Sequence, residues 1–241
     1  MQDLIEAAAR NRAILCDRIC RAQGIGSRFL PGIWRTTGTA PPLLPDAITL
    51  PGMSGPPPQV ELRALLAGRP RGLTVMDSAA ALDLGSEGYA PLADADWITR
   101  NRPSPPPAPL TLVRIAQPAD LGLWEGFWRR AEDLPEGHVQ FPPDLIQRRD
   151  IAFLAHLGRD ARPRGGGILL HGAGVVSVSN LFSLGPQPEA LFAAVAACAA
   201  RLWPGRPVVG CESGARLDAA RIAGFTPIGP LRLWRHPGSA Q

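Results

Sequence analysis

The sequence predicts an α/β (α+β) fold, because segments typical of strands and helices alternate along its second half. Residues 168–170 and 175–182 are aliphatic and β-branched, as strands are. Residues 189–203 are rich in alanine and place apolar side chains at helical spacing. A strand that turns directly into a helix aims the N–H groups of the helix N-terminus at the space above the strand end, which suits a phosphate or a carboxylate.

The composition is that of a globular protein. The 241 residues are 45% hydrophobic and 19% charged, and this length fits one large domain or two small ones. All 25 basic residues are arginine, and the net charge is +4. No basic run is interleaved with aromatic residues, so we expect no binding of nucleic acid.

The first residues and the cysteines bear on the compartment. The N-terminal segment carries acidic side chains and lacks the apolar core of a signal peptide, and no apolar run is long enough to span a bilayer. We therefore expect a soluble cytoplasmic protein without membrane contact. The cysteines (Cys16, Cys20, Cys198 and Cys211) form no Cys-x-x-Cys pair, and the four histidines lack metal-ligand spacing. We expect reduced, packed thiols and no metal.

The first half of the chain is predicted to be a small unit that ends at a proline-rich spacer. Its expected elements are a helix over 3–21, an irregular stretch at 29–58 with short extended pieces such as 47–50, a short helix over 61–67, a strand over 73–76, and a helical turn over 77–84, with Trp97 at its close. Residues 104–109 (Ser-Pro-Pro-Pro-Ala-Pro) are typical of a stiff polyproline II spacer. We therefore place a first domain at 1–103, a linker at 104–109 and a second domain at 110–241.

The second domain is predicted to hold a longer series of strands and helices. The expected elements are strands over 110–115 and 151–157, helices over 118–131 and 144–149, the two central strands joined by a tight turn at 171–174, the helix over 189–203, a strand over 207–211, a helix over 214–223, and one or two strands over 226–234.

A segment of the first half recurs in the second. Residues 77–83 (Asp-Ser-x-Ala-x-Leu-Asp) match residues 212–218 (Glu-Ser-x-Ala-x-Leu-Asp) column for column, and a Gly-aromatic-x-Pro motif follows each. Trp97 then falls opposite Trp234, and we expect each tryptophan to close the sheet of its own domain. Coincidence in a chain rich in alanine and glycine is one explanation. The preserved order of residue types favours duplication, with little room for upstream strands in the first copy.

Residues 219–229 (Ala-Ala-Arg-Ile-Ala-Gly-Phe-Thr-Pro-Ile-Gly) complete an order of elements that resembles the GNAT N-acetyltransferases. In these proteins a helix is followed by Gly-Phe and the last strands. The resemblance covers residues 110–236, about half of the chain, and implies a mixed, mainly antiparallel sheet flanked by helices. With the internal match, it implies that residues 1–103 are a smaller, truncated GNAT-like copy.

The resemblance also implies a site for acetyl-CoA. GNAT proteins bind it where the central strand splays from its neighbour: pantetheine pairs with the strand backbone, and the diphosphate lies on a Gln/Arg-x-x-Gly-x-Gly/Ala loop. The corresponding residues are Ser179, Asn180, Leu181 and Phe182 for pantetheine and Ser183, Gly185 and Gln187 for the diphosphate. Pro186 and Pro188 stand where the two glycines belong. Because proline has no N–H, we expect fewer donors to the diphosphate.

Acyl transfer from a thioester to an amine benefits from a base and from an acid for the leaving thiolate. The family's usual acid is a tyrosine shortly before Gly-Phe, but Ala220 stands there and the chain's one tyrosine is Tyr89. His171 is of a residue type suited to a base, although a histidine in a turn is commonly just solvated. Glu212 ends a strand at the sheet edge where ligands gather, and can act as a base through water or hold the amine. The alternative role of Glu212 is to cap the helix that starts at Gly214, which Ser213 could do instead.

Two functions follow from the sequence. The first is an acyl-CoA-dependent N-acyltransferase, most simply an acetyltransferase, that acts on a small-molecule or peptide amine of unknown identity. The second is a catalytically inactive GNAT-like binding or interaction module. The missing loop glycines and tyrosine favour the second function, whereas the order of elements and the open strand edge favour the first. A homodimer is compatible with both.

Overall fold

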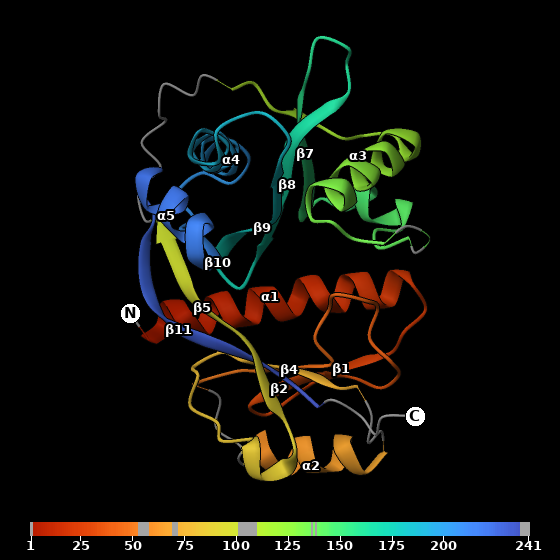
Figure 1. Cartoon of the computed structure of the whole chain (residues 1–241), viewed down its shortest axis with the longest axis vertical. Coiled ribbons are helices and arrows are strands. Elements are labelled where there is room, and N and C mark those ends of the chain that lie inside the picture. Colours follow the sequence, from red (N-terminus) through yellow and green to blue (C-terminus); the bar gives the residue numbers. More distant parts are fainter. Residues whose placement is uncertain are drawn as a thin grey trace. The chain divides into compact units, whose positions relative to one another are not determined.

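The structure is a computed structural model that describes residues 2–52, 58–68, 72–100, 110–135, 137 and 139–236 (Figure 1). In these ranges the chain forms an α+β fold with five α-helices and eleven strands. It divides into two compact units: unit 1 is Met1–Trp97 with Ile228–Gln241, and unit 2 is Ile98–Pro227. Two long strands, β5 (Ala90–Arg100) and β11 (Thr226–Arg235), contribute residues to both units. Within the described ranges, no helix combines the length and the apolar character that crossing a bilayer requires.

Unit 1 is built on a mixed sheet in the strand order β1-β2-β3-β4-β11-β5. Its parallel pair is β3 with β4, and the pairs β1–β2, β2–β3 and β4–β11 are antiparallel. Side chains of the second helix pack on the strands in one apolar cluster with Tyr89 and Trp234. The elements are α1 (Gln2–Ala22), β1 (Ser27–Leu30), β2 (Ile33–Thr36), β3 (Ala47–Thr49), α2 (Pro58–Gly68), β4 (Thr74–Asp77) and the 3-10 turn η1 (Gly85–Glu87).

The predictions for this part of the chain hold only in part. In the stretch 29–58, the extended piece expected at 47–50 is confirmed as β3, whereas β2 and the second half of β1 were not predicted. These strands have only three or four residues between prolines and glycines, which is too short for an alternating pattern to stand out. The expected helical turn over 77–84 is an irregular turn, and a 3-10 turn follows at Gly85–Glu87. Trp97 lies inside the eleven-residue strand β5, which the sequence did not predict.

Unit 2 has the strand order β5-β10-β9-β8-β7-β6. β9 and β10 are parallel, and the pairs β6–β7, β7–β8 and β8–β9 are antiparallel. The mixed, mainly antiparallel sheet flanked by helices is therefore confirmed. The elements are β6 (Val113–Arg114), α3 (Pro118–Ala131), the 3-10 turn η2 (Pro143–Gln147), β7 (Ile151–Leu157), β8 (Pro163–Gly172), β9 (Val175–Ser183), α4 (Pro188–Leu202), β10 (Val208–Glu212) and α5 (Gly214–Ile222).

The helices of unit 2 cover opposite faces of its sheet, as Figure 1 shows for α3 and α4. On β7, Ala152 and Leu154 belong to the apolar cluster of α4 and α5, whereas the Phe153 ring lies 5.3 Å from the ring of Trp124 in α3. Alternate residues of a strand point to opposite faces. The face of α3 is therefore distinct from the face of α4 and α5.

The internal sequence match coincides with a repeated order of elements. In each unit a helix joins two parallel strands: β3-α2-β4 in unit 1 and β9-α4-β10 in unit 2. Gly88 and Gly224 then adopt positive φ angles of 83° and 86° before the buried Tyr89 and Phe225. Duplication remains our interpretation of this parallel. The expectation that the first copy has little room for upstream strands is wrong, because β1 and β2 precede β3.

The predicted linker, 104–109, lies outside the described residues, so the boundaries at 103 and 110 stay a prediction. The structure assigns most of the last strand, β11, to unit 1 and not to the second half of the chain. The predicted second domain runs to residue 241, whereas Ile228–Gln241 belongs to unit 1. Trp234 lies in the apolar cluster of unit 1 and does not close the sheet of unit 2.

We predict that Gly166→Ala destabilises the protein by about 2 kcal/mol or more. A Cβ at this position in β8 would overlap the Leu154 carbonyl oxygen and lie 2.7 Å from Nε1 of Trp124. Urea unfolding would measure the loss. Gly122→Ala in α3 is the matched control, because nothing lies within 4 Å of its added Cβ, and it should leave stability unchanged or raise it by up to about 1 kcal/mol. Equal stability of both variants would contradict the packing described here.

We predict that iodoacetamide at pH 8 modifies Cys211 before the other cysteines of the native protein. Cys16, Cys20 and Cys198 are buried, whereas Cys211 is partly exposed. Burial raises the pKa of Cys16 and Cys198 and raises that of Cys20 to about 12, and the thiolate is the reactive form. Peptide mass spectrometry would rank the rates. A Cys16–Cys20 or Cys198–Cys211 disulfide in protein prepared without oxidant would contradict the expected reduced state.

Candidate functional site

Strand β9 contains a bulge at the segment to which the resemblance assigns pantetheine. Ile168 of β8 pairs with Ser179, and Gly166 pairs with Phe182, so two residues of β9 oppose one residue of β8. Asn180, inside the bulge, has a φ of 49°, in the left-handed region. A bulge bends its strand and re-aims the side chains that follow it.

Beyond its start, β9 also parts from β10. The parallel register joins Val176 to Val208 and Ser177 to Val209, and it extends no further within these two fully described strands. β9 nevertheless continues to Ser183. From the bulge onward, β9 therefore has no register partner on β10, and backbone N–H and C=O groups there need other partners. We call this place, where the two strands part, the opening.

The corresponding place in unit 1 is closed. The parallel strands β3 and β4 pair at Ala47–Val75 and Ile48–Met76, and two further hydrogen bonds follow at the strand ends. The Ser78 N–H donates to Thr49 Oγ1 at 2.8 Å, and the Ser78 hydroxyl donates to the Thr49 carbonyl at 2.7 Å. Of the two parallel strand pairs in the described residues, β3–β4 is thus held together at its ends, whereas the register of β9 with β10 stops at Ser177.

Glu212 is brought to this opening. It is the last residue of β10, four residues after Val208, just as Asn180 is four residues after Val176 on the neighbouring strand. Its side chain is partly exposed. Ser213 occupies the N-cap position of α5 but makes no side-chain capping hydrogen bond.

His171 lies at the other end of the strands. It belongs to β8, not to the turn where it was expected, and it pairs with Val176. At a rise of about 3.3 Å per residue, Val176 is roughly 13 Å from Asn180 along β9. The His171 ring stacks on Trp203, with 5.6 Å between centroids. His171 therefore lies at the far end of β9 from the predicted pantetheine segment, whereas Glu212 ends the neighbouring strand on the same side as that segment.

The residues expected to bind the diphosphate lie at the end of β9 and in the loop that leads to α4. Gly185 and Gln187 are exposed, and Gln187 is the N-cap of α4 without a side-chain capping bond. The Ser183 hydroxyl donates to the Pro186 carbonyl within the loop, so its hydrogen is already used there. Pro188 is the first residue of α4 and offers no N–H.

Two charged residues at the opening were not predicted from the sequence. Arg216 of α5 donates to the carbonyl of Leu181, and its Nη2 donates to Glu132 Oε1 at 2.6 Å. Glu132 is the C-cap residue of α3. One signal was present: a positive side chain in the first turn of a helix opposes the helix dipole, which suggests a special partner.

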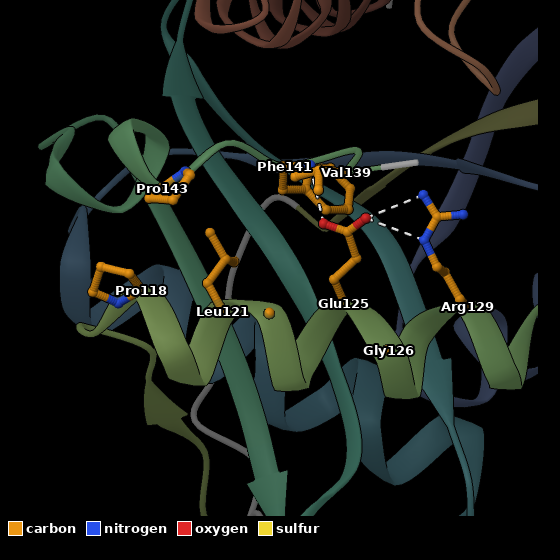
Figure 2. A pocket seen from close by; sticks show the side chains of 9 residues that line it. Pro118, Leu121, Glu125, Gly126, Arg129, Val139, Phe141 and Pro143 are labelled. Atoms are coloured by element: carbon orange, nitrogen blue, oxygen red, sulfur yellow. Dashed lines mark hydrogen bonds and ion pairs between the residues drawn. The ribbon is translucent and has the colours of Figure 1, made fainter. Parts of the chain in front are cut away.

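A pocket of about 390 Å³ lies along α3 (Figure 2). It is bordered by one face of α3 and by the chain that leads into η2. Its lining is mostly apolar, with Glu125 and Arg129 at one side. The lining residues are Pro118, Leu121, Gly122, Glu125, Gly126, Arg129, Val139, Phe141 and Pro143.

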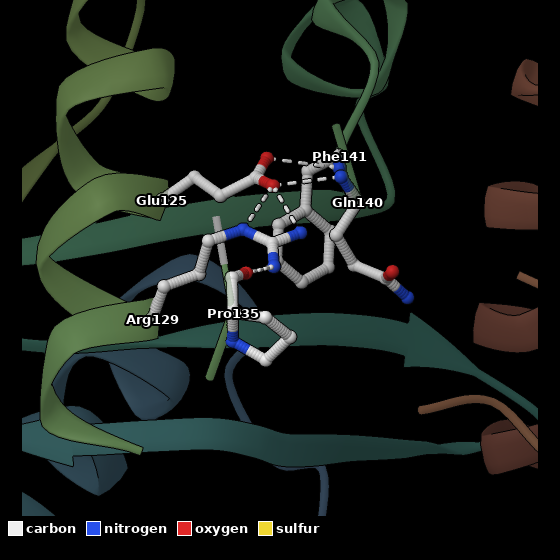
Figure 3. A network of polar contacts seen from close by, with 5 residues as sticks. All are labelled: Glu125, Arg129, Pro135, Gln140 and Phe141. Atoms are coloured by element: carbon white, nitrogen blue, oxygen red, sulfur yellow. Dashed lines mark hydrogen bonds and ion pairs between the residues drawn. The ribbon is translucent and has the colours of Figure 1, made fainter. Parts of the chain in front are cut away.

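The charged pair of this pocket is engaged in a polar network (Figure 3). The Glu125 carboxylate accepts the N–H groups of Gln140 at 2.7 Å and Phe141 at 3.1 Å. It also accepts hydrogen bonds from Nε and Nη2 of Arg129, both at 3.1 Å. Nη1 of Arg129 donates to the Pro135 carbonyl at 2.8 Å. The network fixes the chain at 139–141 onto α3. The pocket can therefore enclose an apolar group, whereas the Glu125 carboxylate is already engaged in hydrogen bonds that stabilise the fold.

Comparison with solved structures identifies the fold. A GCN5-related N-acetyltransferase from Kribbella flavida superposes with a TM-score of 0.61 at 16% identity, over 93% of this chain and 96% of that protein. A conserved protein of unknown function from Staphylococcus epidermidis gives 0.60 at 11% identity, over 88% and 93%. A GCN5-related N-acetyltransferase from Sphaerobacter thermophilus gives 0.57 at 17% identity, over 81% and 74%.

No protein-family model matches the sequence, and a search of curated proteins finds no match. The chain therefore has the fold of GNAT N-acetyltransferases across most of its length, as the resemblance implied for residues 110–236. At these identities the likeness concerns the fold alone.

Proposed function

We propose that this protein is an acyl-CoA-dependent N-acyltransferase, with acetyl-CoA as the simplest donor, and that its acyl site is the opening between β9 and β10. The observation that carries this proposal is the end of strand pairing after Ser177, which leaves the backbone at 179–182 beside the opening. GNAT-fold proteins use acyl-CoA, and the amides of a pantetheine arm can pair with such a backbone.

The loop at 183–188 supports the diphosphate only in part. The N-terminus of α4 offers a favourable dipole, and Gly185 and Gln187 are exposed next to it. Pro186 and Pro188 remove two N–H donors, and Glu189 in the first turn opposes a negative ligand. We therefore expect weak binding.

In the proposed reaction, the lone pair of an amine attacks the thioester carbonyl carbon. The C–S bond then breaks, CoA leaves as a thiolate that takes up a proton, and the nitrogen loses one. Glu212 stands at the level of the bulge and is the residue that we assign to accept that proton, directly or through water. The acceptor is an amine of unidentified structure, and the apolar pocket along α3 is a candidate place for its apolar part.

The alternative function is a catalytically inactive interaction module. The two loop prolines and Ala220, where the family's acid tyrosine is expected, favour it. His138, which the resemblance puts near the acceptor, lies outside the described residues. Titration with acetyl-CoA separates the two functions.

We predict that calorimetry detects acetyl-CoA binding at about one site per chain, because Thr49 and Ser78 close the equivalent place in unit 1. Replacing both Pro186 and Pro188 with glycine should tighten binding by roughly tenfold or more, since each charge-assisted hydrogen bond is worth about 1.5–3 kcal/mol. Pro58→Gly is the matched control, because Pro58 likewise opens a helix, α2 in unit 1, and it should leave the dissociation constant unchanged. Absence of heat at millimolar acetyl-CoA for the native and double-glycine proteins would favour the interaction module.

We predict that Glu212→Gln lowers kcat about a hundredfold and leaves acetyl-CoA affinity within about twofold, as expected for loss of a general base. Thiol release, measured with an amine identified in an acceptor screen, would give kcat and its pH profile. Asp218→Asn is the control, because this carboxylate on α5 is 71% exposed. An unchanged kcat in Glu212→Gln would remove Glu212 from the mechanism.

A further inference from the structure

The Arg216 side chain joins the two helix layers of unit 2 at the place where β9 and β10 part. Arg216 comes from α5, whose residues pack in the cluster with α4. Its partner Glu132 ends α3, on the opposite face of the sheet. Between these helices the guanidinium also donates to the carbonyl of Leu181 in β9. The side chain therefore bridges the end of the sheet.

This bridge uses a backbone group that an acyl-CoA ligand would need. Leu181 lies in the segment 179–182, along which the proposed function places the pantetheine arm. The amides of that arm carry N–H donors, and a strand carbonyl is their natural acceptor. In the present structure the Leu181 carbonyl already accepts a hydrogen bond from Arg216.

The bridge is not suited to attract an anion. The Glu132 carboxylate contacts Arg216 with both oxygens, at 2.6 and 3.3 Å, so the charge of the guanidinium is compensated. A free anion, or an acyl chain with a terminal carboxylate, would have to displace Glu132. The contact between Arg216 and Glu132 is therefore suited to close the opening and is not suited to bind an anionic group of a ligand.

The bridge can nevertheless open at modest cost. The side chains of Arg216 and Glu132 are 40% and 28% exposed, and ion pairs of such exposure contribute little to stability. Arg216 also stands in the first turn of α5, where the helix dipole disfavours a cation. Water can solvate both charges once the pair separates.

We propose that Arg216, held by Glu132, is a plug that closes the acyl site, and that acyl-CoA binds only as the guanidinium leaves the Leu181 carbonyl. This inference rests on the proposed function. Arg216 is here a gating residue that competes with the ligand, and it takes no part in bond making. Acyl-CoA affinity is therefore lowered by the equilibrium between plugged and open states.

The test is a calorimetric titration of the full-length protein with acetyl-CoA at low salt. Arg216→Met removes the guanidinium and keeps an apolar side chain of similar reach. The plugged state then loses one hydrogen bond to a carbonyl and one partly exposed ion pair, so acetyl-CoA should bind about tenfold more tightly. Glu132→Gln keeps the side-chain shape and should tighten binding about two- to threefold. Arg221→Met is the matched control on α5, 51% exposed, and should bind like the native protein.

A second comparison separates the plug from the loop. Introduced into the protein with glycine at 186 and 188, Arg216→Met should tighten binding by the same factor as in the native chain, because the two changes act on different parts of the ligand. Raising the salt should shrink the ratio of native to Arg216→Met dissociation constants, since salt weakens the ion pair.

Three other results would contradict the proposal that Arg216 is a plug. Equal or weaker binding by Arg216→Met, with binding intact in the double-glycine protein, would make Arg216 a bystander or a ligand contact and leave the proposed function standing. If Arg216→Met does not fold, unchanged or weaker binding by Glu132→Gln decides against the plug. No heat from the native, double-glycine and Arg216→Met proteins would remove both the plug and the proposed function.

Discussion

The close packing of α3 on its sheet is the constraint on which the rest of unit 2 depends. Trp124 lies flat enough on the strands for its Nε1 to donate to the Leu154 carbonyl at 2.8 Å, which is possible because Gly166 has no side chain in between. The rings of Phe141, Phe153 and Phe182 surround it at 5.3–5.7 Å. This contact seats α3, and with it both the Glu125 network and Glu132 at the helix end.

The same packing explains the bulge in β9. Before the bulge, Val176 and Val178 face the cluster of α4 and α5; after it, Leu181 faces that cluster and Phe182 reaches Trp124. The even-numbered residues of β9 therefore point to one face of the sheet before Asn180 and to the other face after it. Only an extra residue in the strand can produce that change. Burial of two large apolar side chains offsets the cost of a left-handed asparagine, which is on the order of 1 kcal/mol. The shape of the proposed acyl site is therefore a consequence of core packing.

This explains how much the sequence could predict. The elements of unit 2 follow from long apolar patterns, and the helix over 118–131 and the strand over 151–157 have the expected bounds. The place of Glu212 at the end of a strand was predicted because a strand end is a local property, and its role in the site stays a prediction. Arg216 was missed because its partners, Leu181 and Glu132, are 35 and 84 residues away in the chain. The position of His171 likewise depends on strand register, which no local pattern contains.

Backbone hydrogen bonding gives a physical argument for the first of the two proposed functions. Sequence drift in an inactive copy accounts equally well for the loop prolines and for the missing tyrosine. It does not account for the contrast between the two parallel strand pairs. In unit 1, Ser78 joins the ends of β3 and β4 through Thr49, whereas β10 provides no register partner for β9 beyond Ser177. A strand edge beside an opening has to find donors and acceptors elsewhere, and closing it is the stable solution when no ligand is bound. Unit 2 closes it with one partly exposed arginine, Arg216, which in our proposal a ligand replaces, and this difference favours an acyl site over a structural remnant.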